Sequence, residues 1–332
     1  SPELIRVPIF EPNQIFKFFS RKKVNQLSAG MLSANPGLFE KILLYLRGNL
    51  FIPDARKYWK NKVVKTIEAY LKNNPEIDTL ITTGPPHSVH LIGLALKNKT
   101  SLRWIADFRD PWTTISYHRY LRLSKRSKQI HKKLEEQVLN SCDDLIVTSP
   151  KTKSNFEKIT NKPIHLITNG YDFDNPKLKP NSEVFKMSYV GSLLRDRNPL
   201  LLWEVLSDLI NENKDFNACF ELHFYGKQAS NFKEIIAHYK LDSIVHFHGY
   251  VSHQEAIELM SSSQVLLLIE INSEQTSEII TGKLFEYLGV NRPVLALGPE
   301  NWSVGELITA LKAGSYFSYS QKDELKAYLI EA

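Results

Sequence analysis

Short apolar, β-branched runs alternate along the chain with longer segments whose apolar residues recur at helical spacing. The short runs predict strands at 79–83, 103–106, 144–148, 164–168, 186–190, 220–224, 244–248, 265–270 and 293–297. The segments between them predict helices at 58–73, 88–98, 127–141, 199–212, 254–261 and 282–289. Continuous apolar strands separated by helices are typical of parallel sheets that are covered on both faces. The pattern therefore predicts an α/β protein with two doubly wound domains.

Residues 169–185 interrupt this pattern with a concentration of Asn, Pro, Asp and Gly. The charge balance reverses at the same place. Residues 1–180 carry 30 Lys and Arg against 16 Asp and Glu, a net charge of +14, whereas residues 181–332 carry 12 against 20, a net charge of −8. We therefore predict domains at 1–180 and 181–332. The basic domain suits nucleic acid, an anionic membrane surface or a phosphorylated substrate.

Composition narrows the class of protein further. The chain has 332 residues, of which 42% are hydrophobic and 23% charged, so two ordinary globular cores are expected and wholesale disorder is excluded. Its two cysteines, Cys142 and Cys219, form no CxxC motif, which argues against a disulfide framework or zinc cluster. The apolar run 265–269 is too short to span a bilayer, and no signal peptide opens the chain, so a cytoplasmic protein is expected.

Polar residues gather after the predicted strands, where parallel sheets bind their ligands. In the first half, His87 follows strand 79–83, and Asp107, Arg109 and Asp110 follow strand 103–106. We interpret Asp107 or Asp110 as a contact for a substrate hydroxyl, oriented by Arg109. The structural alternatives are an Asp–Arg pair that pins a loop and a His87 that caps or packs against a helix.

In the second half, Gly191 and Ser192 follow strand 186–190, with Arg195 and Arg197 close behind. A glycine turn lets the backbone approach a ligand closely, and a guanidinium can bind two phosphate oxygens at once. These residues therefore predict a phosphate site.

The segment 278–289 completes this predicted site. Thr281 and Gly282 begin a helix whose first N–H groups can bind phosphate, and Lys283 adds a positive charge. Glu286 can accept hydrogen bonds from a ribose diol, and Glu278 stands eight positions before it. In the alternative interpretation, Lys283 and Glu286 form a solvent-exposed ion pair that stabilises the helix by roughly a few tenths of a kcal/mol.

Other clusters carry less. Asp172 and Asp174 lie in the linker, and His246 and His248 alternate on one strand without an evident third ligand, so no metal site is expected. The basic run 122–133 lacks the interleaved aromatic residues that stack on bases. We expect it to be a solvated helix face, with contact to anionic lipid as the alternative.

The segments TTGPPHS, WIADFRDPW, ITNGYD, YVGSLLRDRNP and TGKLFEYLGVNRPVLALG resemble those of retaining, nucleotide-sugar-dependent glycosyltransferases of the GT-B fold. The resemblance is to the large bacterial polysaccharide and O-antigen family, of the group 1 or family 4 type. It covers essentially the whole chain, and the last segment is the most specific.

The resemblance implies a role for each candidate residue. Its donor site for a nucleotide diphospho-sugar, UDP-linked, comprises Gly191, Ser192, Arg195, Arg197, Tyr250, Val251, Glu278, Thr281, Gly282, Lys283, Leu284 and Glu286. Within this set, Glu286 resembles the ribose-binding carboxylate, Lys283 and its adjacent backbone the diphosphate clamp, and Tyr250 with Val251 the base-binding edge. The residues Asp107, Arg109 and Asp110, together with His87, are implied to position the acceptor and the transferred sugar.

The sequence departs from the family pattern in three places. Ser192 stands where many members have Arg, which shifts phosphate binding to Arg195 or Arg197, and Glu274 competes with Glu278 as the first glutamate. The family's N-terminal strand and Gly-rich acceptor loop have no match. The segment 322–332 resembles a helix that is cut short, so we expect a sequence trimmed at both ends.

The implied function is transfer of a hexosyl or related group to a saccharide or polyprenyl-diphosphate-linked acceptor in bacterial cell-surface polysaccharide synthesis. Such an enzyme works in the cytoplasm, peripheral to the membrane, needs no cofactor or dedicated metal, and binds no nucleic acid. Two alternatives stay open: a sugar-nucleotide epimerase of the same architecture, and a non-catalytic scaffold or nucleic-acid-binding protein that uses the basic half.

Overall fold

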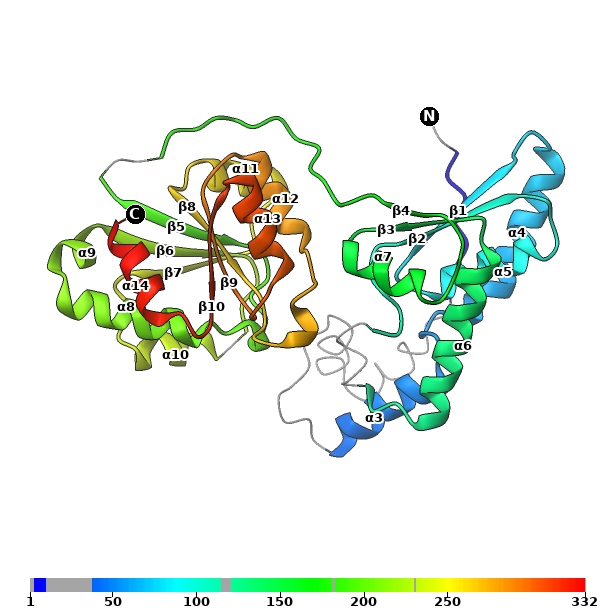
Figure 1. The fold of residues 1–332 in the computed structure, drawn as a ribbon, viewed down its shortest axis with the longest axis horizontal. Coiled ribbons are helices and arrows are strands. Elements are labelled where there is room, and N and C mark those ends of the chain that lie inside the picture. The colour runs from blue at the N-terminus through cyan, green and yellow to red at the C-terminus, as the bar shows by residue number, and fades with distance from the viewer. Residues whose placement is uncertain (1–2, 10–37, 115–120, 181–182, 230, 332) are drawn as a thin grey trace. The chain divides into compact units, whose positions relative to one another are not determined.

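The computed structural model describes residues 3–9, 38–114, 121–180, 183–229 and 231–331. They divide into two compact units, Ser1–Thr168 and Asn169–Ala332 (Figure 1). The second unit thus begins at the start of the Asn- and Pro-rich segment. Asn175 in that segment donates a hydrogen bond from Nδ2 to the carbonyl oxygen of Val290 at 2.8 Å, which ties the segment to the second unit.

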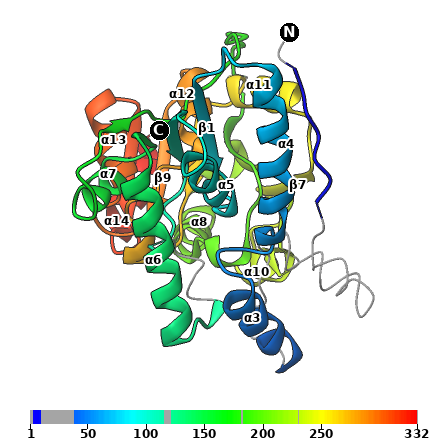
Figure 2. The ribbon, with the colours of Figure 1, turned by 90° about the vertical axis from the view of Figure 1, so that its right-hand side faces the viewer.

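The first unit contains a parallel sheet of order β1-β2-β3-β4. Its strands are β1 (Thr79–Gly84), β2 (Arg103–Phe108), β3 (Asp144–Val147) and β4 (Ile164–Leu166), and its helices are α3 (Leu38–Leu50), α4 (Lys60–Asn73), α5 (Ser88–Lys97), α6 (Lys125–Ser141) and α7 (Pro150–Glu157). Helix α4 packs beside α5 (Figure 2). Trp104 and Phe108 of β2 are fully buried, whereas Ile81 of β1 is 59% exposed. The described part of this sheet is therefore covered more completely on one face than on the other.

The second unit contains a parallel sheet of order β10-β9-β8-β5-β6-β7. Its strands are β5 (Phe185–Val190), β6 (Phe220–Tyr225), β7 (Val245–Gly249), β8 (Val265–Ile269), β9 (Val294–Gly298) and β10 (Gly314–Ser318). Strands β8 and β9 are buried along their whole length, as their continuous apolar sequences predict. The first strand of the unit, β5, lies at the centre, so the chain winds outward from β5 in one direction and from β8 in the other.

Helices cover both faces of this second sheet. One face carries α8 (Leu200–Glu212), α9 (Lys214–Cys219), α10 (Phe232–His238) and α14 (Lys322–Glu331), and the other carries α11 (His253–Ser261), α12 (Gly282–Gly289) and α13 (Ser303–Leu311) (Figure 1). Two apolar cores result, one on each side of the sheet. The predicted α/β class with two doubly wound parallel sheets is confirmed.

The predicted strands are all present, with ends that differ by at most two residues. Strand β2 continues through Asp107 and Phe108, two residues beyond the predicted end at 106. Strand β10 was missed because GSYFS contains few apolar residues. Residues 3–9, which look strand-like in sequence, form no strand.

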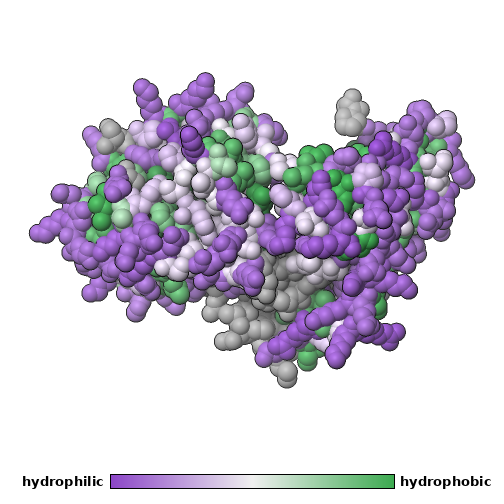
Figure 3. Space-filling view, in the orientation of Figure 1, coloured by the Kyte–Doolittle hydropathy of each residue, from purple (hydrophilic) through white to green (hydrophobic). Residues whose placement is uncertain are grey.

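The basic run 122–133 begins the long helix α6, which is capped by Ser124, whose Oγ accepts a hydrogen bond from the backbone N–H of Ser127 at 3.1 Å. Lys128, Lys132 and Lys133 are exposed on it, and the surface there is hydrophilic (Figure 3). Within the described residues, no helix combines the length and hydrophobicity that a membrane span requires.

Candidate functional site

The site lies in the second unit, where β5 and β8 are neighbours at the point at which the strand order reverses. Gly191 follows β5, and Glu270 follows β8. In open α/β sheets, the helices after two such strands diverge to opposite faces and leave a crevice at the carboxyl ends. Three elements therefore converge here: the Gly191 turn, the Glu270 turn and the N-terminus of α12.

Gly191 lets a lysine side chain lie against the backbone. Its φ of +132° is a conformation that side-chain-bearing residues rarely adopt, and a Cβ at this position would overlap Cε of Lys283. Gly226, with φ of +127°, packs against the carbonyl oxygen of Gly191 in the same way. The backbone N–H of Gly191 donates to the carbonyl oxygen of Tyr225 at 2.7 Å. Two glycine turns thus make room for Lys283.

Lys283 is half-buried. Its Nζ donates to the hydroxyl of Tyr189 at 2.6 Å and lies 4.2 Å from the centroid of the Tyr189 ring. The pKa of Lys283 is lowered to about 7, mainly by burial and also by the positive charge of Arg197, while Glu270 and Glu286 oppose the shift. An anion bound beside this amine would stabilise its protonated form.

Arg197 and Glu270 form an ion pair with two contacts. Nη2 of Arg197 lies 3.0 Å from Oε2 of Glu270, and Nε lies 3.3 Å from Oε1. The Glu270 side chain is only 1% exposed, and its Oε1 also accepts the backbone N–H of Ile271 at 2.9 Å. Burial alone would lower the pKa of the Arg197 guanidinium, but Glu270 and Tyr189 raise it above its ordinary value. The positive charge of Arg197 is therefore held in place by Glu270.

This pairing changes the role expected of Arg197. The sequence predicts a guanidinium that binds two phosphate oxygens, but in the structure its Nε and Nη2 are engaged by Glu270. Sequence reasoning did not select Glu270 or Tyr189 as site residues. The available signal was a single carboxylate at the end of the otherwise apolar strand VLLLIE.

The N-terminus of α12 is not capped by a side chain. Thr281 occupies the N-cap position, yet its Oγ1 is buried and has no hydrogen-bond partner among the described residues. A Cβ added at Gly282 would meet only open space. The side chain of Leu284 is buried in the core, so this residue can offer a ligand only its backbone. This arrangement suits an anion bound at the first turn of the helix.

The predicted glutamates and Ser192 differ in how far they are exposed and in what they contact. Glu286 is half-buried in α12, where its carbonyl oxygen accepts the backbone N–H of Val290 at 3.1 Å. Glu274 begins a short 3-10 helix, Glu274–Thr276, and is exposed, whereas Glu278 is half-buried. Ser192 accepts a hydrogen bond from the Tyr189 hydroxyl through its carbonyl oxygen at 3.0 Å.

Three further donor residues occupy the loops of the second unit. Tyr250, after β7, is 80% exposed, and Val251 packs against the core that includes Leu284. Arg195 lies in the 3-10 helix Arg195–Arg197, and its side chain is outside the described part of the chain.

The candidates of the first unit lie at the carboxyl ends of β1 and β2. Asp107 is half-buried within β2, opposite Thr83 in the ladder with β1. The backbone N–H of Arg109 donates to the carbonyl oxygen of Gly84 at 3.0 Å. Asp110 lies at the surface, yet the surrounding protein raises the pKa of its carboxyl, with Arg109 opposing the rise. A carboxyl with a raised pKa suits exchange of a proton with a hydroxyl.

His87 is buried at the N-cap position of α5 and stacks on Trp112, with ring centroids 4.9 Å apart and an angle of 3° between the rings. Its side chain does not cap the helix. Oδ2 of Asp54 does so instead, by accepting the backbone N–H of Ser88 at 2.8 Å. A carboxylate of the chain therefore lies at the N-terminus of this helix.

Residues 33–175 match the model of a family described as Glycosyltransferase Family 4. No protein with a curated description matches the sequence. Solved structures do, beginning with a sucrose-phosphate synthase from Thermosynechococcus elongatus. Its TM-score is 0.60 at 15% identity, over 83% of this chain and 69% of its own.

Two other solved structures are similar. The lipopolysaccharide outer core galactosyltransferase WaaB matches with a TM-score of 0.54 at 16% identity, over 81% of this chain and 70% of its own. A variant of TarM from S. aureus, in complex with fondaparinux, alpha-GlcNAc-glycerol and UDP, also matches. Its TM-score is 0.54 at 15% identity, and the match covers 79% of this chain and 50% of TarM.

The chain has the GT-B glycosyltransferase fold. The Family 4 match falls mainly on the first unit and ends at 175, whereas the structural likenesses extend over both units. At identities of 15% and 16%, those likenesses establish the fold alone.

Proposed function

We propose that this GT-B chain transfers a sugar from a nucleotide diphospho-sugar to a hydroxyl of a saccharide or lipid-linked saccharide. The observation that carries the proposal is the half-buried Lys283, which lies against the Gly191 turn at the strand-order reversal and in the first turn of the uncapped helix α12. Removing water from a protonated lysine side chain costs free energy unless an anion lies beside it. The Family 4 match supports glycosyl transfer as the reaction class.

The donor diphosphate would bind between the Gly191 turn and the first turn of α12. Lys283 would supply a positive charge, and the uncapped N–H groups after Thr281 would donate hydrogen bonds. Glu286, one turn along α12, would accept hydrogen bonds from the ribose hydroxyls. We propose UDP as the nucleotide, since the TarM structure with this fold was solved with UDP.

Catalysis would be mainly electrostatic. The acceptor oxygen forms a bond to the anomeric carbon while the bond from that carbon to the diphosphate oxygen breaks, and the acceptor proton passes to the departing diphosphate or to a carboxylate. Negative charge develops on the leaving oxygen, where Lys283 and the helix N–H groups stabilise it. Arg197 would act at a distance, because Glu270 and Tyr189 hold its charge in the site.

The first unit would present the acceptor, with Asp107 or Asp110 as the hydrogen-bond partner of its hydroxyl. Retention of the anomeric configuration is proposed from the sequence resemblance. A lipid-linked acceptor is consistent with WaaB, whose description names the lipopolysaccharide outer core. The exposed lysines of α6 would then contact anionic headgroups, and flotation with liposomes that contain or lack anionic lipid tests this contact.

Transfer is tested by incubating the protein with a panel of nucleotide sugars and with lipid-linked or free saccharide acceptors, followed by product analysis. We expect acceptor-dependent release of nucleoside diphosphate, which Glu286→Ala abolishes or strongly weakens. The matched control is Glu234→Ala, an exposed glutamate in α10 of the same unit. Epimerised donor formed without acceptor would contradict the proposal. So would thermal stabilisation by DNA with no response to any nucleotide.

A further inference from the structure

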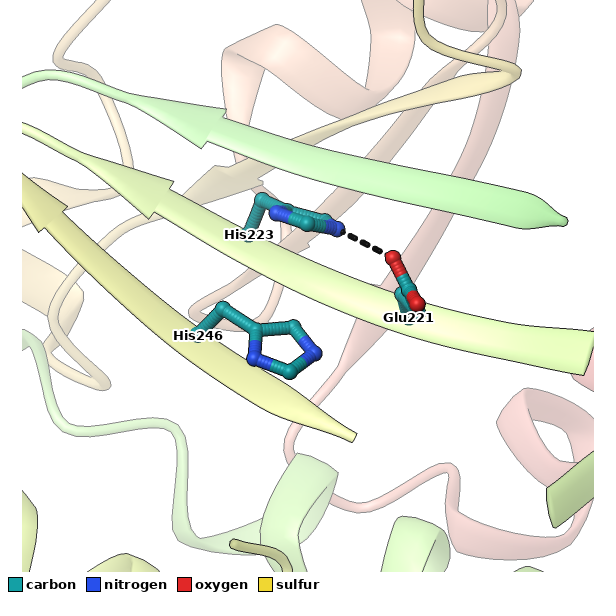
Figure 4. Close-up of side chains that lie close together, drawn as sticks. All are labelled: Glu221, His223 and His246. Carbon is teal, nitrogen blue, oxygen red and sulfur yellow. Dashed lines mark hydrogen bonds and ion pairs between the residues drawn. The ribbon is translucent and has the colours of Figure 1, made fainter. Parts of the chain in front are cut away.

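A second cluster of chemically active side chains lies on β6 and β7, outside the donor site. Glu221 and His223 come from β6, and His246 comes from the neighbouring strand β7 (Figure 4). His223 and His246 are directly opposite each other in the strand register. In the sequence, His246 and His248 have no evident third ligand, because nothing in the sequence aligns β6 with β7.

The three side chains share one face of the sheet. Phe220, Leu222 and Phe224 of β6 are buried in the core, so the alternating residues Glu221 and His223 lie on the opposite face. One potential ligand atom from each residue of the cluster lies within 4.8 Å of the others. The cluster is accessible from solvent, with the Glu221 side chain 41% exposed and that of His223 12% exposed.

We propose that Glu221, His223 and His246 bind Zn²⁺ at the outer edge of the second sheet. Two imidazoles and one carboxylate form a ligand set that zinc accepts, with water completing a tetrahedron. At Zn–N distances of about 2.0–2.1 Å, the ligand atoms of a tetrahedral site stand roughly 3.3 Å apart. The partly exposed ligand side chains on the neighbouring strands β6 and β7 would reach this spacing through small rotamer changes.

The cation would enter between His223 and Glu221, whose Nε2 and Oε2 atoms are 2.8 Å apart. The ring proton would then lie on Nδ1 of His223, which is 2.8 Å from Nε2 of His248 and can donate to it. This makes His248 a positioning residue, since a hydrogen bond to the second ring nitrogen orients a metal-bound histidine.

Lys186 opposes the cation. It lies opposite Glu221 in the register of β5 with β6, and its Nζ is 5.3 Å from the ring centroid of Tyr225. Removing this charge should therefore strengthen Zn²⁺ binding, which is the opposite of what removal of a ligand does.

The bound ion would add a cross-link between two strands that are already joined by their backbone ladder and by the hydrogen bond between His223 and His248. Strand β7 is the last strand of the sheet order, and it ends at Gly249, directly before the exposed Tyr250. Zn²⁺ would thus stabilise the edge of the second unit. This role does not depend on the proposed sugar transfer.

The test uses the full chain without a histidine tag, dialysed against Zn²⁺, Co²⁺ or Mg²⁺ and assayed for bound metal. We expect about one Zn²⁺ per chain, a Co²⁺ absorption spectrum typical of tetrahedral coordination, no stoichiometric Mg²⁺, and a raised melting temperature with Zn²⁺. Failure of the wild-type chain to take up Zn²⁺ or Co²⁺ would overturn the proposal.

Variants assign the ligands. His223→Ala, His246→Ala and Glu221→Gln should each weaken Zn²⁺ binding at least about tenfold, and His248→Ala should weaken it about 10- to 100-fold. Glu221→Gln serves if a histidine variant fails to fold, because its side chain is near-isosteric. The control is His238→Ala, an exposed histidine in α10. Unchanged Zn²⁺ uptake by the ligand variants would also overturn the proposal.

Discussion

The protonation state of Lys283 should make donor binding depend on pH. Its pKa is lowered from 10.5 to about 7, so in the free protein the amine is mostly charged at pH 6 but only about one-tenth charged at pH 8. A diphosphate beside the amine stabilises the charged form and returns the pKa toward its ordinary value. Binding at pH 8 must therefore be accompanied by protonation of Lys283.

The expected magnitude follows from these values. Full restoration of the pKa implies uptake of about 0.9 proton per donor bound at pH 8, against about 0.1 at pH 6. Because the amine must first be protonated at the higher pH, the affinity should fall about tenfold between pH 6 and pH 8, or about 1.4 kcal/mol. The direction is weaker binding as the pH rises through the pKa of the free protein.

Isothermal titration calorimetry in buffers of different ionisation enthalpy measures this proton uptake. The ligand should be an intact nucleotide sugar such as UDP-glucose, whose diphosphate diester keeps the same charge across this range, unlike UDP. Lys283→Met should remove the uptake at pH 8 and flatten the affinity profile, whereas Lys233→Met, at an exposed lysine of α10, should change neither. Equal uptake at pH 6 and pH 8, or uptake that persists in Lys283→Met, would refute the reasoning.

Three further predictions concern the same site. Glu286→Ala should raise the donor KM at least about tenfold, since it removes the proposed charge-assisted hydrogen bonds to ribose; an unchanged KM in steady-state kinetics would exclude this role. Gly191→Ala should lower the free energy of unfolding by about 1–3 kcal/mol and weaken donor binding, because φ is +132° and the new methyl group meets Lys283. Denaturant unfolding measures the loss of stability, and a variant as stable as the wild type would contradict this prediction. Arg197→Met should destabilise the protein by about 3–5 kcal/mol, because it leaves the carboxylate of Glu270 buried and unpaired. Adding Glu270→Gln should recover much of this loss. Equal instability of the single and double variants would count against the ion pair.

The hydrophobic pattern alone predicted the α/β class of both units and most of their strands. Runs such as VLLLI and PVLAL would expose apolar side chains to water if either face of the strand were uncovered. They therefore predicted strands buried on both faces, as β8 and β9 are. The helix at 282–289 was likewise predicted from its local pattern. Local sequence also placed Gly191, Lys283 and Glu286 near strand ends, because a glycine turn and a helix start are short-range features.

Only the tertiary structure decided which of these groups meet. Gly191 and Lys283 are neighbours because β5 pairs with β8, and Arg197 is held by Glu270 because the chain returns to the same edge after two intervening strands. Similarly, Asp54 caps α5, and His223 faces His246 across β6 and β7. These contacts join residues far apart in sequence, and the strand order that creates them is set by packing of the whole sheet. No local pattern specifies that order.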